Sequence, residues 1–180
     1  MTAADSLAIR LAGPADTAAL AGLVRGLLQF ERYGKQEHVT PEAVAAWIGG
    51  AAPAIEVLLA EQAGSAVGYL AFYRAFSLFR GGPVLLVENL YVAEEARGRG
   101  VGRRLLAAAA AEAEKRGYGR IELHVRADNP ESRAFYRRVG FFEPGEAVCR
   151  IEDTALARLA REDYGEDYGE DRGEDPGINR

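Results

Sequence analysis

Hydrophobic and polar positions follow two different periods along this chain, and the periods predict an ordered set of strands and helices. Alternation with period two, or a short unbroken apolar run, indicates a strand, whereas apolar residues three and four apart indicate a helix. The strand-like segments are residues 7–11, 55–61, 67–76, 84–92, 121–125 and 147–151. The helix-like segments open at residues 14–16 and 40–42 and cover residues 103–116 and 130–139. This element order predicts an α/β domain with a central mixed sheet and helices on both faces.

Local signals support several of these boundaries. Thr40 is a suitable N-cap, and Pro41 suits the first position of the helix that follows, which carries Val44, Trp47 and Ile48 as an apolar stripe. A turn at residues 63–65 joins two strand-like segments, so these segments are expected to form a hairpin.

Length and charge divide the chain into a body and an acidic tail. The 180 residues suit one domain, which we expect to cover residues 1–161. Of the 27 acidic and 22 basic residues, 8 and 2 lie in residues 162–180, which leaves 19 and 20 for the body. The tail repeats Glu-Asp-x-Gly and has few apolar groups, so we expect residues 162–180 to be disordered. A solubilising role and an acidic arm for cationic partners both remain open for it.

Composition argues against several classes of protein. No apolar run is long enough to span a membrane, and the first residues lack a secretory signal, so the sequence predicts a cytoplasmic protein that binds neither membrane nor nucleic acid. Cys149 is the single cysteine, and only His38 and His124 accompany it, so neither a disulfide nor a metal-ligand cluster is expected. Cys149 lies in an alternating run and is expected to be a strand residue.

A basic, glycine-rich segment follows the strand-like residues 84–92 and precedes a helix. Glycines let the backbone turn sharply and approach a ligand, and the first amides of a helix lack intrahelical partners, so a phosphate group is a natural occupant. The spacing excludes G-x-G-x-x-G, and no Gly-Lys-Ser/Thr follows, so dinucleotide and NTPase loops do not fit. The remaining match is R-x-x-G-x-G, formed by Arg97, Gly100 and Gly102. An arginine- and glycine-rich surface turn is the alternative.

A second motif identifies the family. The segment from Asn129 to Phe141 has the form N-x-x-A/S-x-x-F-Y-x-x-x-G-F, and it follows the glycine loop in the order found in one superfamily. Together the two motifs resemble the GNAT superfamily of N-acetyltransferases. The resemblance implies a single GNAT-type domain that uses acetyl-CoA as co-substrate. It implies that acetyl-CoA is bound by Leu90, Tyr91, Val92, Arg97, Gly98, Arg99, Gly100, Val101, Gly102, Arg103, Asn129, Ser132 and Tyr136.

Two side chains are candidates for the acid–base chemistry of acetyl transfer. Tyr136 matches the tyrosine that supplies a proton to the departing thiolate in GNAT enzymes, although its position is also that of a core aromatic. Glu88 interrupts an apolar strand just before the glycine loop, so it is either a general base, acting directly or through water, or a solvent-facing glutamate at a strand end. Asn129 is also a good helix cap.

A closer resemblance concerns the acceptor. The motifs are similar to those of diamine, spermidine/spermine and thialysine acetyltransferases, which use acidic residues to recognise a cationic amine. The matching acceptor-site residues here are Phe30, Glu31, Glu88, Asn89 and Glu122. Asn89 replaces an aspartate typical of that group. The sequence therefore predicts transfer of acetyl to a primary amine of a small cationic molecule. A protein N-terminal or lysine acetyltransferase and a non-catalytic acyl-CoA sensor remain the alternatives. Dimers are common among relatives, so a homodimer is compatible with the resemblance.

Overall fold

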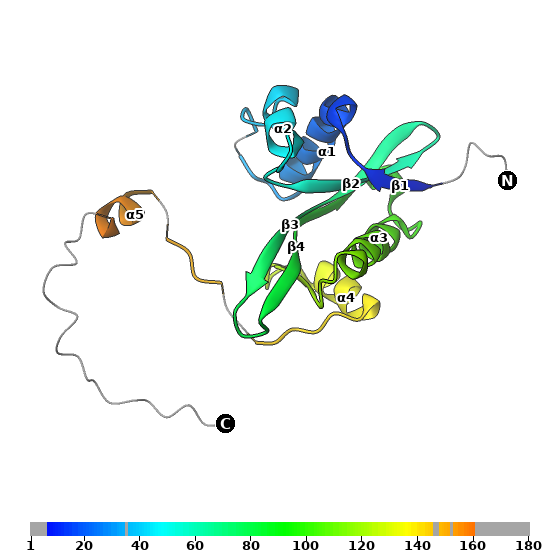
Figure 1. Cartoon of the computed structure of the whole chain (residues 1–180). Helices are drawn as coiled ribbons and strands as arrows, with labels where there is room; N and C mark the ends of the chain where they lie inside the picture. The colour runs from blue at the N-terminus through cyan, green and yellow to red at the C-terminus, as the bar shows by residue number, and fades with distance from the viewer. Residues whose placement is uncertain (1–6, 35, 146–147, 152, 161–180) are drawn as a thin grey trace, which may run out of the picture. The chain divides into compact units, whose positions relative to one another are not determined.

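The computed structural model describes residues 7–34, 36–145, 148–151 and 153–160 and contains one five-stranded mixed sheet (Figure 1). The strands lie in chain order, and their bounds are β1 Ala8–Leu11, β2 Glu56–Gln62, β3 Ser65–Ser77, β4 Gly82–Val92 and β5 Ile121–Leu123. Neighbouring strands from β1 to β4 are antiparallel, whereas β5 pairs with β4 in parallel. The sheet is therefore mixed, as the sequence predicted.

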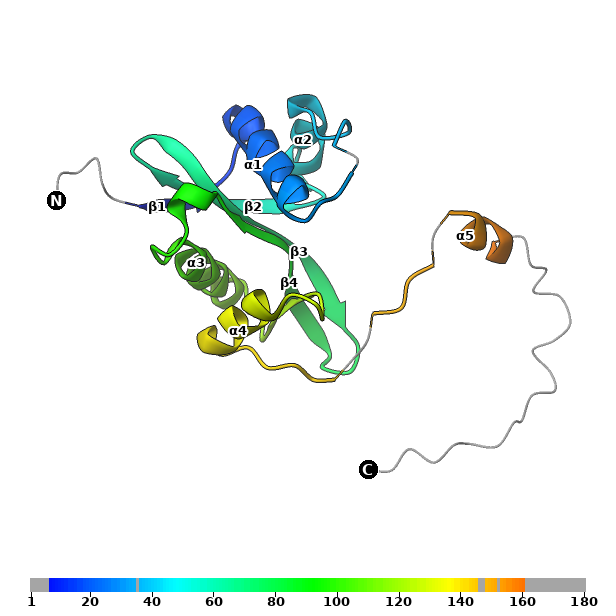
Figure 2. The same ribbon diagram turned by 180° about the vertical axis from the view of Figure 1, so that it is seen from behind.

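Helices cover both faces of this sheet. Their bounds are α1 Thr17–Phe30, α2 Pro41–Ile48, α3 Val101–Lys115 and α4 Pro130–Val139. Helices α1 and α2 lie on one face, and α3 and α4 lie on the other, as the two opposite views show (Figures 1 and 2). Because helices cover both faces, strand residues are buried without alternation, and Val84 to Val87 are all buried.

The core beneath α1 and α2 brings the N-terminal half of the chain against the sheet. Leu20 and Leu23 of α1 pack with Val44 of α2 and with Leu59 and Tyr69 of the sheet. The Thr40 hydroxyl accepts a hydrogen bond from the amide of Ala43, which confirms the cap expected from the sequence. This core holds α1 close to β3 and β4, the strands that carry the candidate active site.

The C-terminal segment differs from the prediction. The chain divides into two units, residues 1–140 and 141–180, and the second contains helix α5, Asp153–Leu159, which the sequence did not predict. Residues 148–151 form no strand, and Cys149 is exposed, so the strand predicted over residues 147–151 is wrong for its described part. Alternating apolar and polar residues indicate that a segment suits a strand with one buried face. A strand also needs a neighbouring strand for its backbone hydrogen bonds, and the sequence does not show whether one is present. The predicted tail, residues 162–180, lies outside the described residues.

Candidate active site

Glu88 lies at an irregularity in β4, at the point where β5 ends. Ala71 of β3 faces Asn89, and Phe72 faces Val87, so Glu88 is the extra residue of a β-bulge. The last β5 residue, Leu123, faces Val87 in the parallel pair. A bulge bends its strand and re-aims a side chain, and bulges are frequent beside active sites. The bulge places the exposed Glu88 carboxylate where β4 loses its neighbour on the β5 side.

Beyond the bulge, β4 presents backbone groups to the space on the β5 side. The amide of Leu85 donates to the carbonyl of Arg120, which leads into β5, whereas the amide of Ala93 donates to the carbonyl of Val67 in β3. Backbone groups of successive strand residues point in alternating directions. Allowing for the bulge, Leu90 and Val92 direct their backbone groups away from β3 and toward the open side. Among the three β4 residues expected to bind acetyl-CoA, these two have the suitable backbone direction.

The glycine loop leads directly into helix α3. Gly98 and Gly100 have φ angles of 72° and 79°, a left-handed conformation that side chains disfavour. Helix α3 begins at Val101, and the first helical hydrogen bond of this turn runs from the Arg104 amide to the Gly100 carbonyl. The amides of residues 101–103 precede that bond and are therefore available to a pyrophosphate. The conformation fits the loop predicted from R-x-x-G-x-G.

Helix α4 places Phe135 beside this loop, and the Tyr136 ring packs against the Phe135 ring with the two centroids 5.2 Å apart. The side chain of Asn129 caps α4 by accepting a hydrogen bond from the Ser132 amide at 3.0 Å. A Cβ atom added at Gly102 would lie 3.4 Å from the Phe135 ring and 3.9 Å from Leu90, so the start of α3, α4 and β4 converge here. Tyr136 is half-buried, and burial raises the pKa of its phenol. The neutral phenol is the form that can donate a proton.

The acceptor-site residues expected from the sequence have different surroundings. Glu31 lies at the end of α1, near enough to Arg126 to help raise the pKa of that guanidinium, after the larger contribution of Asp128. The Asn89 side chain donates to the backbone carbonyl of Glu88. Glu122 forms an ion pair with Arg120 and faces Leu86, so an amine would have to compete with an arginine for its carboxylate.

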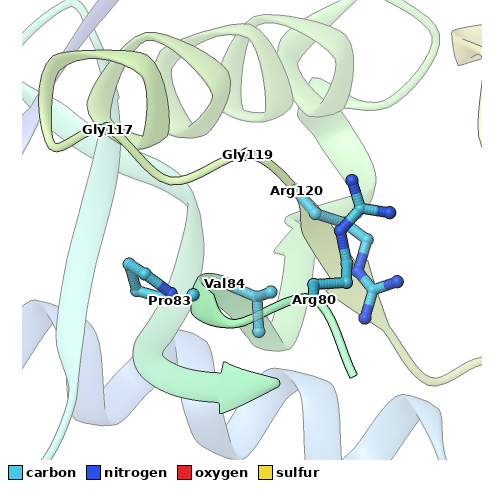
Figure 3. A pocket seen from close by; sticks show the side chains of 7 residues that line it. Arg80, Pro83, Val84, Gly117, Gly119 and Arg120 are labelled. Carbon is cyan, nitrogen blue, oxygen red and sulfur yellow. The ribbon is translucent and has the colours of Figure 1, made fainter. Parts of the chain in front are cut away.

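A pocket of about 160 Å³ lies at the opposite end of β4 from the glycine loop (Figure 3). Pro83 and Val84 contribute to its wall, and Figure 3 shows the side chains of Arg80 and Arg120 together at one side. It lies at the start of β4, whereas the bulge and the glycine loop lie toward its end. The pocket is therefore separate from the candidate active site.

Residues 23–141 match the model of the Acetyltransferase (GNAT) family, and this match covers more than half of the chain. The chain belongs to this family. A thialysine N-epsilon-acetyltransferase of Bos taurus is 29% identical over 164 residues, which cover 84% of this chain and 96% of the relative. An integron cassette protein of V. cholerae has a similar structure, with a TM-score of 0.74, 20% identity and coverage of 87% of this chain and 98% of that one. An aminoglycoside N-acetyltransferase solved in complex with CoA matches with a TM-score of 0.69 and 18% identity, over 82% and 95% of the two chains.

Membership makes this protein an acetyl-CoA-dependent N-acetyltransferase. The described part of the chain has no cluster of three or more histidine, cysteine or acidic residues suited to a metal ion. Within the same residues, none of the helices combines the length and the apolar character needed to cross a bilayer.

The structure of this GNAT domain also joins two residues that sequence reasoning assigned to different substrates. The guanidinium of Arg97 lies over the Phe30 ring at 4.5 Å and over the Tyr91 ring at 5.6 Å, and its Nε donates to the Val92 carbonyl at 2.9 Å. Arg97 was expected at the donor and Phe30 at the acceptor. The contact links the glycine loop to the end of α1, and no sequence pattern indicates it because the residues are 67 positions apart.

Proposed function

We propose that this enzyme acetylates a primary amine of a small cationic molecule, such as a diamine, a polyamine or an amino-acid side chain. The observation that carries the proposal is the position of Glu88, whose exposed carboxylate lies at the bulge where β5 leaves β4. A carboxylate attracts an ammonium group and also accepts the proton that the amine must lose before it attacks. The family relative named as a thialysine acetyltransferase supports an amine on a small molecule.

The backbone conformation supports a donor site at the glycine loop and the end of β4. The amides of residues 101–103 and the loop glycines would hold the pyrophosphate of acetyl-CoA, and Leu90 and Val92 would offer main-chain groups to its pantetheine arm. Val92 already accepts from Arg97, so binding at its carbonyl requires that this side chain turn aside. The Arg97 guanidinium would then be free to reach an anionic group of the donor.

The chemical step needs one base and one acid. Glu88 takes a proton from the ammonium group, in our proposal through a water, and the resulting amine attacks the thioester carbonyl. As the carbon–sulfur bond breaks, the Tyr136 phenol gives its proton to the leaving thiolate. Burial keeps Tyr136 protonated near neutral pH, because desolvation disfavours the phenolate. The nitrogen loses its second proton as the amide forms, and that proton returns through water to the Tyr136 phenolate, while Glu88 releases the first proton to solvent.

A screen of acetyl-CoA consumption across polyamines, amino acids, aminoglycosides and short peptides tests the proposed acceptor. We expect small diamines or amino-acid side chains to give higher kcat/KM values than peptides. A peptide as the best acceptor would support the protein acetyltransferase instead.

The role of Glu88 is tested separately with Glu88→Gln, using the exposed α3 residue Glu114 as a matched control. Glutamine does not titrate, so the acidic limb of the pH–rate profile should disappear and turnover should fall by about 10²-fold or more. Glu114→Gln should leave both unchanged. An acidic limb preserved in Glu88→Gln would assign the base to another group.

A further inference from the structure

Tyr69 of β3 has a buried hydroxyl without a protein partner. The residue is 1% exposed, and among the described residues no group forms a hydrogen bond with its hydroxyl oxygen. Its ring lies 6.3 Å from that of Tyr91, which it faces in the sheet, and the neighbouring core side chains Leu20 and Leu23 are apolar. A buried polar group without a partner destabilises a fold, and phenylalanine would fill the same space without that cost.

The strand register places Tyr69 two residues along β3 from the bulge that carries the proposed base. Tyr69, Ala71 and Tyr73 alternate along β3, and the first two belong to the core beneath α1. Glu88 is the extra residue opposite the step from Ala71 to Phe72, so the two tyrosines flank it along β3. The residue between the two tyrosines on this face of β3 is Ala71, whose methyl side chain occupies little of the space between them.

Electrostatics agree with this placement. The pKa of Tyr69 is raised chiefly by burial and further by Tyr91 and Glu88, and the pKa of Tyr73 is raised by burial and then by Glu88. Both phenols are therefore within electrostatic reach of the Glu88 carboxylate. Tyr73 is only half-buried, so solvent can satisfy its hydroxyl, whereas Tyr69 depends on an internal partner.

We propose that the Tyr69 hydroxyl is a positioning group that anchors the water through which Glu88 deprotonates the acceptor amine. The inference rests on the proposed function. In the step, the ammonium group of the acceptor passes a proton to the water, the water passes one of its own to the Glu88 carboxylate, and the neutral amine that remains can attack the thioester. Tyr69 donates a hydrogen bond to the water oxygen and keeps its proton throughout. Among the described residues, the ionisable groups that act on this hydroxyl are Tyr91 and Glu88 of β4, and the side chains from α1 and β2 that share its core, including Leu20, Leu23 and Leu59, are apolar.

The test compares Tyr69→Phe with Tyr118→Phe, which makes the same chemical change just beyond α3. The wild type and both variants are assayed as full-length enzyme with the best amine from the screen, over the whole pH–rate profile, and by urea unfolding. Tyr69→Phe should lower kcat/KM for the amine by about tenfold or more, with the KM for acetyl-CoA unchanged. In the wild type, the hydrogen bond from Tyr69 to the water favours the ionised form of Glu88. Without it the apparent pKa of the base should rise, so the midpoint of the acidic limb should move to higher pH. Stability should be equal or higher, and Tyr118→Phe should change neither rate nor profile.

The double variant Tyr69→Phe/Glu88→Gln separates this inference from the proposed function. If both residues serve one relay, adding Tyr69→Phe to Glu88→Gln should produce little further loss. If Tyr69→Phe has no effect on rate or profile while Glu88→Gln abolishes the acidic limb, the anchoring role is wrong and the base stands. If Glu88→Gln retains the acidic limb of the pH–rate profile, both the assignment of Glu88 as the base and the positioning role of Tyr69 are wrong. Fully additive losses would also overturn the shared relay.

Discussion

Replacing Gly26 with alanine tests how closely helix α1 packs on the strand that carries Glu88. A Cβ atom at Gly26 would lie 2.8 Å from the hydroxyl oxygen of Tyr91 and 3.1 Å from the carbon that bears it. The Tyr91 ring extends from β4 to α1, where Tyr69 and Arg97 also lie against it, so it cannot move without disturbing several neighbours. The substitution should therefore overpack this part of the core.

The magnitude follows from two opposing contributions. Exchanging glycine for alanine inside a helix stabilises it by about 0.8–1 kcal/mol, whereas overpacking a well-packed core costs about 1–3 kcal/mol. Gly22 provides a matched control, because it lies in the same helix, is exposed, and has no atom within 4 Å of an added Cβ. Gly22→Ala should raise the free energy of unfolding. Since the helix contribution cancels between the two variants, Gly26→Ala should be less stable than Gly22→Ala by about 1–3 kcal/mol.

Urea unfolding, followed by the fluorescence of the single tryptophan, measures this difference. Trp47 packs against the same core as Tyr91, so its emission reports on the relevant region. Tyr91→Phe removes the nearest atom and leaves the ring carbon at 3.1 Å, so combining it with Gly26→Ala should recover part of the loss. Equal stabilisation by Gly22→Ala and Gly26→Ala would refute the close packing of Gly26 against Tyr91.

Three further predictions concern the donor site, the proposed acid and acid stability. Tyr136→Phe should lower turnover by about 10²-fold or more while acetyl-CoA affinity stays the same, and unchanged turnover would remove Tyr136 as the acid. Gly102→Glu should abolish acetyl-CoA binding in calorimetry, because the added Cβ would lie 3.4 Å from the Phe135 ring and the added charge would repel the pyrophosphate. Gly119→Glu, where no atom lies within 4 Å of an added Cβ, is the control. The pKa of Asp16 is lowered to about 2, chiefly by hydrogen bonds from Arg10, so its stabilisation is complete above pH ~4 and lost as the pH falls toward 2. Asp16→Asn should thus cost about 1 kcal/mol near neutral pH, after allowance for solvent screening, and parallel pH–stability curves for variant and wild type would contradict this.

Local sequence signals predicted most of the elements correctly. Helix α4 spans residues 130–139 as expected, because Asn129 supplies a cap, Pro130 suits the first helical position and Gly140 has the left-handed conformation that ends it. The hairpin of β2 and β3 followed from two strand-like runs and a short turn. Each of these signals acts within a few residues of the backbone that it shapes, so no tertiary partner is needed to recognise it.

Non-local pairing decided what the sequence left open or predicted wrongly. β5 ends at Leu123 instead of continuing to Val125, and residues 148–151 form no strand, because strand length depends on the neighbour as well as on the segment itself. The sequence could not choose between a general base and a solvent-facing strand-end glutamate for Glu88. The structure shows an exposed side chain at a bulge, and a bulge exists only as a mismatch between two strands.

By itself, the sequence determined the family and the order of the main strands and helices as far as α4, and it predicted which residues bind acetyl-CoA, because glycine spacing, capping residues and hydrophobic period are local properties. Only the tertiary structure decided which backbone groups of β4 face the open side, that Arg97 stacks on Phe30, and that the Tyr69 hydroxyl is buried without a protein partner. Those features depend on strand register and on helix packing between distant segments. The same non-local geometry decides which groups can reach a reacting amine.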